Sequence, residues 1–488
     1  MADQNNSLDP EDWASFRAKA HQMLDAALDH AQGARDGRVW TPVPDHTKAA
    51  LNEVVPLDPQ GTDRVCEDLI SNVLPYATGN THPRFFGWVH GAGAAGGIIS
   101  EAMAAAMNSN LGGRDHGANY VEQQVIDWVK ELFKFPQTAS GLVVSGTSVA
   151  TLIALSAARY AKAGYNVRSE GIRADQARLV GYTSTEAHSC IARTFDMLGL
   201  GFDALRSIPV DENYQMDTEA LEQAIEADIA AGNKPFCVIG SPATVNTGAI
   251  DDLDQIATLC KTYDLWFHVD GAFGAVAALS ETLKPRFKGI ERADSIAFDF
   301  HKWMHVVYDA GFVLIRSEET HREAFTLRRE YLKAAPRGMA AGNPWFCEYG
   351  PELSRGFRAL KVWFHLKEHG VKKITDKVED NCQQASHLGA LVEARANLEL
   401  ATPVSLNICC FRYVADGLSD AVHDKINAEI VMDLQESGLA APSTTRLQDK
   451  LCIRVNITNH RTTMDDMELL VEAVTDLGPA VRSRILGS

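Results

Sequence analysis

The chain has 488 residues, of which 45% are hydrophobic and 23% charged, and its formal net charge is −18. This length is enough to bury large cores and predicts two or three domains rather than one. The acidic balance works against polyphosphate partners, and the sequence has no Lys/Arg cluster typical of a nucleic-acid site. We therefore expect no nucleic-acid partner.

The nine cysteines are scattered and form no C-x-x-C pair, so zinc spacing is absent and we expect no metal. Their odd, sparse number favours reduced thiols in a cytoplasmic protein. Residues 1–6 have neither the basic nor the apolar region of a signal peptide. The small-apolar stretch from Gly91 to Met107 contains Glu101, so we expect a buried helix and loop there and no membrane span.

Residues 1–85 predict a helical arm ahead of the main domain. Asp9 and Pro10 are typical of a helix N-cap followed by a first-turn proline. Apolar residues then recur at helical spacing, at positions 13, 16, 20, 23, 24, 27 and 28. A proline-rich connector follows, and we expect the arm to pack on something outside itself.

Residues 86–375 predict an α/β domain, because apolar strand-like runs alternate with helix-like runs. Strands are expected at 141–145, 178–182, 235–240, 265–270 and 294–299, and helices at 218–231 and 253–263. Continuous apolar strands separated by helices indicate a mainly parallel sheet that is covered on both faces. Ligands of such sheets bind beyond the carboxyl ends of the strands.

Residues 376–488 predict a small C-terminal α+β domain. Strands are expected at 408–414 and 451–455, and helices at 419–436 and 463–477. Ahead of this domain, glycines and prolines mark a long loop at 329–356, and a helix is expected at 357–366. A loop of that length in a compact domain is usually functional or disordered.

Two side chains of complementary chemistry follow expected strands. Asp270 ends one strand, and Lys302 comes 32 residues later, after one expected helix and one strand. In a parallel sheet this spacing places both at the same edge. Pyridoxal 5′-phosphate requires such a pair: a lysine amine to attack its aldehyde, and a carboxylate to keep its pyridine nitrogen protonated.

A phosphate-binding turn is expected at Ser145-Gly146-Thr147-Ser148, between a strand and a helix. Backbone N–H groups, hydroxyls and the helix dipole would all face a dianion there. The sequence has no G-x-G-x-x-G after the first strand, no G-x-x-x-x-G-K-[ST] and no G-x-S-x-G, which argues against nucleotide and serine-hydrolase sites. The residues therefore predict a pyridoxal-phosphate site built on Lys302.

The runs His268-Val-Asp-Gly-Ala272 and Asp299-Phe-His-Lys-Trp303 resemble the group II pyridoxal-phosphate-dependent amino-acid decarboxylases. That family includes aromatic-L-amino-acid, glutamate, histidine and cysteine-sulfinate decarboxylases. The resemblance extends from about residue 80 to the C-terminus. It implies fold type I with a mainly parallel seven-stranded sheet, a homodimer with active sites at the interface, and decarboxylation of an L-amino acid to an amine.

The resemblance also implies roles around the cofactor ring. Lys302 would carry the cofactor covalently, and Asp270 would bind the pyridine nitrogen. Ala272 would underlie the ring, and His188 would stack on it as a catalytic residue.

At the phosphate, the resemblance implies contacts from Thr147 and Ser148, and His301 is expected to contribute. Many relatives carry Gly-Thr-Thr where this chain has the run 241–248, so that Val245 replaces one threonine. Thr244 is the remaining candidate there.

The substrate pocket is expected to include Phe86, Trp88 and His90, with residues 112–117 nearby. An aromatic wall suits an aromatic substrate. Arg114 or Arg355 would instead bind an acidic side chain, or would only make structural ion pairs, and both interpretations stay open.

The long loop raises a second question. Family decarboxylases use a loop tyrosine, reaching in from the partner subunit, to protonate Cα, and related aldehyde synthases carry phenylalanine there. The position falls near Phe346, with Tyr349 three residues later, and we take Tyr349 as the candidate donor. The alternatives to a decarboxylase are an aldehyde synthase, another fold type I lyase or transferase, or a noncatalytic binding protein of the same fold.

Overall fold

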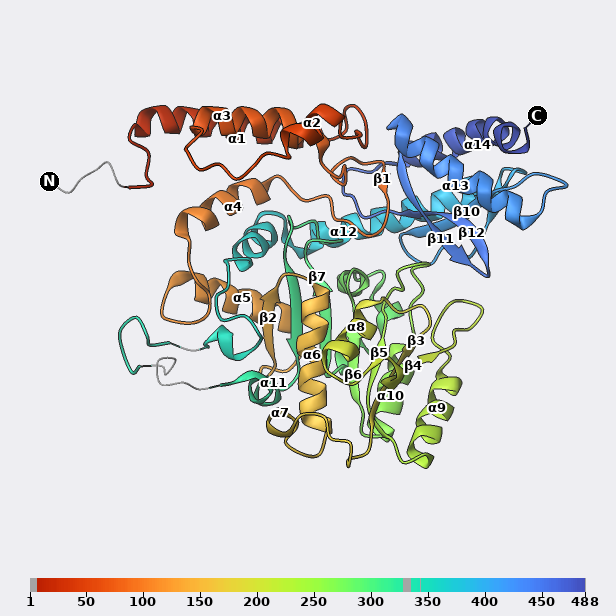
Figure 1. The fold of residues 1–488 in the computed structure, drawn as a ribbon. Helices are drawn as coiled ribbons and strands as arrows, with labels where there is room; N and C mark the ends of the chain where they lie inside the picture. The colour runs from red at the N-terminus through yellow and green to blue at the C-terminus, as the bar shows by residue number, and fades with distance from the viewer. Residues whose placement is uncertain (1–6, 328–334, 343, 488) are drawn as a thin grey trace.

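A seven-stranded sheet forms the centre of the large domain in the computed structural model, which describes residues 7–327, 335–342 and 344–487 (Figure 1). Its strands lie in the order β2 (Ser140–Val144), β8 (Gly311–Ile315), β7 (Ser295–Asp299), β6 (Trp266–Asp270), β5 (Lys234–Gly240), β3 (Leu179–Ser184) and β4 (Leu205–Ile208). Only β8 runs antiparallel to its neighbours. The expected mainly parallel sheet of seven strands is confirmed.

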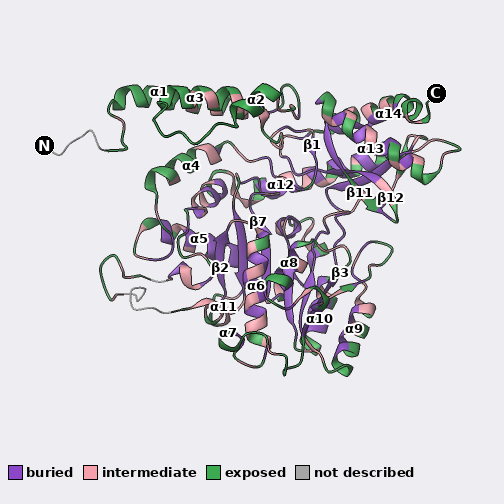
Figure 2. Cartoon of the chain, viewed as in Figure 1, coloured by how far each residue is buried: buried purple, intermediate pink, exposed green. Residues whose placement is uncertain are grey.

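Helices cover the strands of this sheet, which is why five of its seven strands are buried along their whole length (Figure 2). The helices that contact its strands are α5 (Gly117–Leu132), α6 (Thr147–Lys162), α9 (Thr218–Ala230) and α10 (Leu253–Thr262). Helices α7 (Val167–Glu170), α8 (Cys190–Met197) and α11 (Glu318–Phe325) pack on α6. The five strands expected from the sequence are present within two residues at each end. Strands β4 and β8 were not expected.

The link between Asp270 and Lys302 differs from the expectation. It contains three short 3-10 segments, Gly274–Leu279, Lys284–Phe287 and Ile290–Arg292, in place of a single helix. Strands β6 and β7 are nevertheless parallel neighbours, with Asp270 paired to Ala297. The two residues therefore follow adjacent strands at one edge, as the spacing predicts.

A second sheet forms the small domain, in the order β1 (Phe85–Phe86), β11 (Ala441–Leu447), β12 (Lys450–Asn456), β10 (Ile408–Tyr413) and β9 (Leu398–Leu400). Helices α13 (Asp420–Ser437) and α14 (Met464–Leu486) pack with it. The expected C-terminal α+β unit is thus joined by a strand from residues 85–86, because β1 pairs in parallel with β11.

Helix α12 (Ala359–Glu393) connects the two domains. It contacts α4 (Gly96–Met107) and α5 on one side, and β9, β10 and α14 on the other. Gly370 breaks its helical geometry with φ 71°, a conformation that glycine adopts without strain. The boundary expected at residues 375–376 falls inside this helix, five residues after the kink.

The N-terminal arm consists of α1 (Trp13–Gln32), α2 (Asp45–Ala50) and α3 (Thr62–Asp68), and it lies along the top of the molecule (Figure 1). The expected N-cap at Asp9 is wrong, because Asp12 accepts the N–H groups of Ala14 and Ser15 and caps α1. Helix α1 has no buried residue. None of the described helices is long and apolar enough to cross a membrane.

Candidate active site

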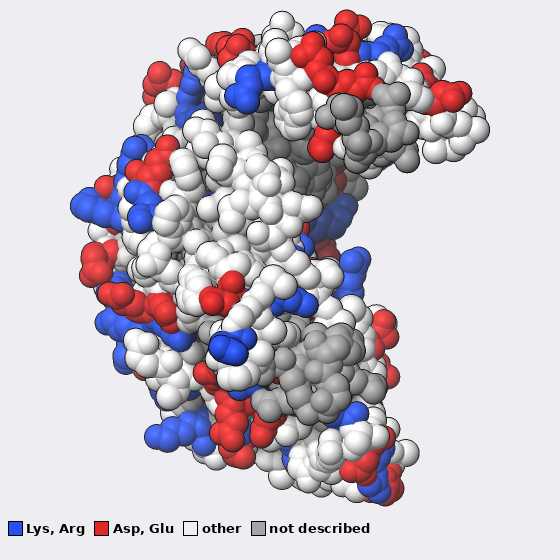
Figure 3. Space-filling model, turned by 90° about the vertical axis from the view of Figure 1, so that its left-hand side faces the viewer, with Lys and Arg blue, Asp and Glu red and all other residues white. Residues whose placement is uncertain are grey.

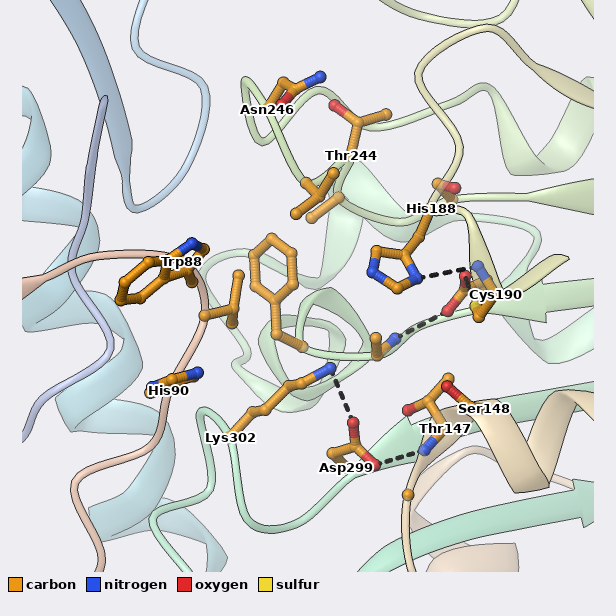
Figure 4. A pocket seen from close by; sticks show the side chains of 18 of the residues that line it. Trp88, His90, Thr147, Ser148, His188, Cys190, Thr244, Asn246, Asp299 and Lys302 are labelled. Atoms are coloured by element: carbon orange, nitrogen blue, oxygen red, sulfur yellow. Dashed lines mark hydrogen bonds and ion pairs between the residues drawn. The ribbon is translucent and has the colours of Figure 1, made fainter. Parts of the chain in front are cut away.

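A cavity of about 540 Å³ opens at the carboxyl ends of the parallel strands (Figure 4). Residues that follow β2, β5, β6 and β7 form its floor, and the segment from Trp88 to His90 forms one wall. Ser443, Thr444 and Arg454 of the small domain complete the lining. The position matches the general site of ligands in open α/β sheets.

Asp299 connects the lysine to the phosphate turn. Its Oδ2 lies 2.8 Å from Lys302 Nζ, and its Oδ1 accepts the Thr147 N–H at 2.7 Å. The carboxylate is 2% exposed, so both contacts are shielded from water. Sequence reasoning missed Asp299, although it ends an expected strand just as Asp270 does, and the same strand-end argument would have found it.

Lys302 is held as a protonated amine by this neighbour. Burial alone lowers the pKa of the amine, but the charge and hydrogen bond of Asp299 outweigh burial and raise the pKa above its ordinary value. Asp270 adds a smaller effect of the same sign. Attack on an aldehyde therefore requires that a proton leave Lys302 Nζ, and Asp299 is the carboxylate in contact with that proton.

Asp270 lies at the end of β6, where burial raises the pKa of its carboxyl group against the opposing charges of Lys302 and His188. The Ala272 N–H donates to its Oδ1 at 3.3 Å, and the Cys190 thiol lies 3.8 Å from its Oδ2. A buried carboxylate with few donors is stabilised by a cationic ring nitrogen placed opposite it. This surrounding fits the role predicted for Asp270.

Besides His90, two histidines line the cavity, His188 and His301. The His188 ring points into it, with its Nδ1 accepting the Cys190 N–H at 3.2 Å (Figure 4). His301 Nδ1 accepts the Ala310 N–H at 3.0 Å, so its neutral form carries the proton on Nε2. Burial lowers the pKa of His301. The His301 ring can thus act as a neutral group at the site.

The turn at 145–148 fits a phosphate group. The Thr147 hydroxyl is buried in the described structure without a hydrogen-bond partner, while Ser148 stands beside it at the first turn of the 16-residue helix α6. Gly146 makes no side-chain cap, and the helix end directs partial positive charge at the cavity. A Cβ at Gly311 would lie 2.4 Å from the Gly146 Cα, so the turn also needs a glycine on β8.

The segment after β5 forms the far side of the cavity. The Thr244 hydroxyl lies 3.0 Å from that of Thr247, and the two side chains share a hydrogen bond. Asn246 donates to Glu186 at 2.9 Å. Thr244 therefore lines the site as expected, while its hydroxyl already has a partner.

Arg454 is a second residue that the sequence analysis missed. Its guanidinium group donates to the carbonyl oxygens of Val245 and Trp88, each at 3.0 Å, and lies 3.3 Å from Ser443 Oγ. Burial lowers its pKa to about 10. A charged residue inside the otherwise apolar strand expected at 451–455 was the available signal.

Of the three expected substrate residues, the cavity includes Trp88 and His90 but not Phe86. The rings of Trp88 and His90 stack with centroids 5.7 Å apart. Phe86 is fully buried in the small-domain core, because β1 pairs with β11 and turns this side chain away from the cavity. Its predicted place in the substrate pocket is wrong.

The two arginines considered for an acidic substrate do not line the cavity. Arg355 is buried against Glu122, with Nη1 to Oε2 at 3.1 Å, and also donates to the carbonyl oxygens of Leu111 and Val143. Its role within the chain is a structural ion pair. Arg114 lies 5.7 Å from the centre of the Trp345 ring, and residues 112–117 are absent from the lining of this cavity.

Tyr349 and Phe346 do not fit the position of a proton donor at this cavity. Phe346 belongs to the 3-10 segment Phe346–Glu348, and both rings are buried in the core of the large domain. The Tyr349 hydroxyl donates to Glu318 at 2.5 Å, and burial raises its pKa. The proposed donor is therefore corrected: its proton is committed to Glu318. Residues 329–334 and 343 of the expected loop lie outside the described residues.

A lysine paired with Asp299, a buried carboxylate, a ring-facing histidine and an anion-binding turn at one sheet edge together define a pyridoxal-phosphate enzyme. The sequence profile described as "Pyridoxal-dependent decarboxylase conserved domain" matches residues 44–414. The chain belongs to this family of pyridoxal-phosphate-dependent amino-acid decarboxylases.

Individual relatives agree with this assignment. An aromatic-L-amino-acid decarboxylase of Bacillus atrophaeus is 33% identical over 96% of both chains. Human histidine decarboxylase is 28% identical over 94% of this chain and 69% of its own length. The fold matches that of the crystal structure of Oryza sativa TDC with PLP and tryptamine at a TM-score of 0.87 and 23% sequence identity. The match covers 97% of this chain and 99% of that chain.

We expect Asp299→Asn to lower the pH at which Lys302 reacts with an aldehyde. The amide still accepts the Thr147 N–H, but the charge that raises the pKa of Lys302 is lost, while the burial that lowers this pKa remains. The measurement is the pH dependence of Lys302 labelling by pyridoxal phosphate with borohydride trapping. Glu186→Gln, which removes a pocket carboxylate bound to Asn246 instead, is the control. An unchanged midpoint in Asp299→Asn would contradict the assignment.

Proposed function

We propose that this chain removes the α-carboxylate of an aromatic L-amino acid, releasing carbon dioxide and the corresponding amine. The observation that carries the proposal is the arrangement of Lys302, Asp270 and His188 around one cavity beside the turn at 145–148. Relatives named aromatic-L-amino-acid and tryptophan decarboxylases support the substrate class.

The lining of the cavity also favours an aromatic side chain over an acidic one. Trp88, Val245 and Phe273 supply apolar surface. Among the described lining residues, the cations are Lys302 and Arg454, and the first is paired with Asp299. Arg454 donates to the protein's own oxygens, so an acidic substrate would have to break those contacts.

Each proposed residue has a distinct task. Bound pyridoxal phosphate supplies a ring that accepts the electrons of the bond between Cα and the carboxylate. Lys302 would hold the cofactor through its amine, and Asp270 would face the ring nitrogen and keep it protonated. Thr147, Ser148 and the N-terminus of α6 bind the phosphate. His188 would contact the ring and orient it, while Ala272, His301 and Thr244, which line the same cavity, would complete its surroundings.

We expect Lys302→Ala to abolish both the visible absorbance of bound cofactor and carbon dioxide release, by on the order of a thousandfold or more, because the covalent link is lost. Wild-type enzyme should release stoichiometric carbon dioxide and amine from aromatic members of an amino-acid panel. Acidic and basic members should react at least about tenfold more slowly. Lys288→Ala, at an exposed lysine bound to Asp254, is the control. Retained turnover in Lys302→Ala would refute the mechanism.

Tyr349→Phe should leave the amine yield unchanged within about twofold, since the hydroxyl serves Glu318 rather than the cavity. The sequence has one further tyrosine between residues 327 and 348, Tyr331, which lies outside the described residues. Tyr331→Phe should lower the amine yield at least about tenfold if the loop supplies the Cα proton. Amine, aldehyde and hydrogen peroxide are measured for both variants. The opposite ranking would restore Tyr349 as the donor.

The surface of the arm supports a homodimer. Helix α1 exposes Trp13, Phe16, Leu24 and Leu28, and the arm overhangs a hollow in the face shown in Figure 3. Exposed apolar side chains at helical spacing form a surface for a second helical layer. At the cavity, Trp88 is 58% exposed and Tyr308 is 48% exposed. A second copy that covers these rings would place the active site at the interface.

Leu24→Glu combined with Leu28→Glu should raise the dissociation constant of this dimer by at least about a hundredfold, because two charges would enter an apolar contact. Gln22→Glu adds one negative charge to the same helix at an exposed polar position and should have little effect. Sedimentation velocity over a range of protein concentrations gives the constant. A monomeric wild type, or equal constants for both variants, would exclude α1 from the interface.

A cytoplasmic location completes the proposal. All nine cysteines are free thiols, seven of them within or near the cores and none in a disulfide. Such a set is typical of a reducing compartment. Acidic and basic side chains are interspersed on the face shown in Figure 3.

A further inference from the structure

A second cavity, of about 240 Å³, lies between the two domains and shares no lining residue with the first. Its walls come from the start of α4, the turn that contains His305, the middle of α12, and the loop at His460 and Arg461. Neither the family motifs nor the proposed reaction uses these residues. The cavity is therefore a separate feature of the chain.

Four histidines face this cavity, in two close pairs. The rings of His305 and His460 have centroids 4.9 Å apart, and those of His365 and His369 are 4.7 Å apart. His305 is 3% exposed, and both of its ring nitrogens are buried without a partner in the described structure. His365 Nε2 and His460 Nδ1 are also unpartnered. Buried polar atoms in this state are costly unless a ligand or water satisfies them.

The remaining side chains make the cavity cationic. Lys373, Lys377 and Arg461 line it, against the single lining carboxylate of Glu368. Glu368 lies 3.3 Å from His369 Nε2, and Lys377 is paired with Asp380 at 2.6 Å. Lys373 makes no ion pair with any described residue. The N-terminus of the 12-residue helix α4 adds partial positive charge.

These groups suit an anion better than a metal ion. Within the described residues, no three His, Cys, Asp or Glu side chains have the arrangement needed to hold a metal. Ammonium and guanidinium groups also repel a cation, whereas imidazole N–H groups and cations together bind oxyanions. The volume is sufficient for a single phosphate-sized ligand.

We propose that this second cavity is a proton-linked binding site for a small oxyanion, a phosphate, sulfate or carboxylate group, formed by the His305–His460 and His365–His369 pairs with Lys373, Lys377 and Arg461. The site is independent of the proposed substrate, because none of these residues lines the catalytic cavity.

Anion binding is linked to proton uptake because the surroundings of these histidines disfavour their protonated form when no anion is bound. Burial, followed by the neighbouring histidines and Arg461, holds the pKa of His305 well below its ordinary value. Burial, and then His369, lower the pKa of His365 to about 4. Burial, and then Arg461 and the neighbouring histidines, lower the pKa of His460 to about 3. An anion stabilises the protonated rings and raises these pKa values, so its binding takes up protons. Affinity must then rise as the pH falls.

The second cavity is connected to the catalytic lysine through backbone hydrogen bonds. The His305 N–H donates to the Lys302 carbonyl oxygen at 3.2 Å, and the Ala94 N–H donates to the His305 carbonyl oxygen at 2.9 Å. One turn of chain therefore separates the unpaired imidazole of His305 from Lys302. An anion that fixes His305 also fixes this turn.

The test is isothermal titration of the cofactor-loaded enzyme, in which the turn at 145–148 is already occupied, with inorganic phosphate, sulfate or succinate. The three arms distinguish a tetrahedral oxyanion from a carboxylate. We expect saturable binding that strengthens at least about threefold between pH ~8 and pH ~6, with proton uptake measured in buffers of different ionisation enthalpy.

Lys373→Gln should weaken binding by about fivefold or more, because an unpaired cation is removed from the cavity. Lys372→Gln is the matched control: the neighbouring lysine is paired with Asp376 at 2.8 Å and does not line the cavity. His460→Gln should reduce the pH dependence and the proton uptake. Both lysine variants lie at exposed positions, so their folding should be preserved.

Three results would overturn the proposal: no saturable binding of any of the three anions, equal weakening by Lys373→Gln and Lys372→Gln, or binding without proton uptake. Tight binding of Zn²⁺ that His460→Gln abolishes would replace the anion with a metal. Because the readout is binding rather than turnover, failure here leaves the catalytic assignment intact. Failure of the decarboxylation assay likewise leaves this site to be judged by titration alone.

Discussion

The buried carboxylate of Asp299 sets the geometry on which the catalytic cavity depends. It accepts the first N–H group of α6 with one oxygen and holds the Lys302 ammonium group with the other. Since α6 follows β2 and Lys302 follows β7, a single short side chain joins two strands that are separated in the sheet by β8. Charge-assisted contacts of this kind are strong when water is excluded. The amine and the anion-binding turn therefore cannot move independently.

The sheet and the central site could be predicted from the sequence because both follow from local pattern. Continuous apolar runs identified five strands, and the ends of β6 and β7 placed Asp270 and Lys302 together. The errors arose where a long-range contact decides the outcome. Phe86 faces the small-domain core because β1 pairs with β11, near the other end of the chain, and the Tyr349 hydroxyl is engaged because it donates a hydrogen bond to Glu318. Spacing along the chain contains neither fact.

Arg454 is a further residue whose role depends on long-range contacts that the local sequence does not reveal. Its position in a strand was predictable, but its function depends on carbonyl oxygens of Trp88 and Val245, in two segments remote from it and from each other. Within the cavity, its guanidinium group joins these two segments. Short sequence motifs thus determine the residues at the floor of the cavity, whereas its walls form when the small domain docks onto the large one.

The contact between Trp88 and Arg454 spans 366 residues, and this separation has a consequence for biogenesis. A chain emerging from the ribosome folds its N-terminal parts first, and contacts between distant residues carry the largest closure cost. The large-domain sheet can form while the catalytic cavity still lacks the wall that β12 supplies. Stable capture of the cofactor must then come late in synthesis, after both domains have docked, so that loading with cofactor reports the completion of folding.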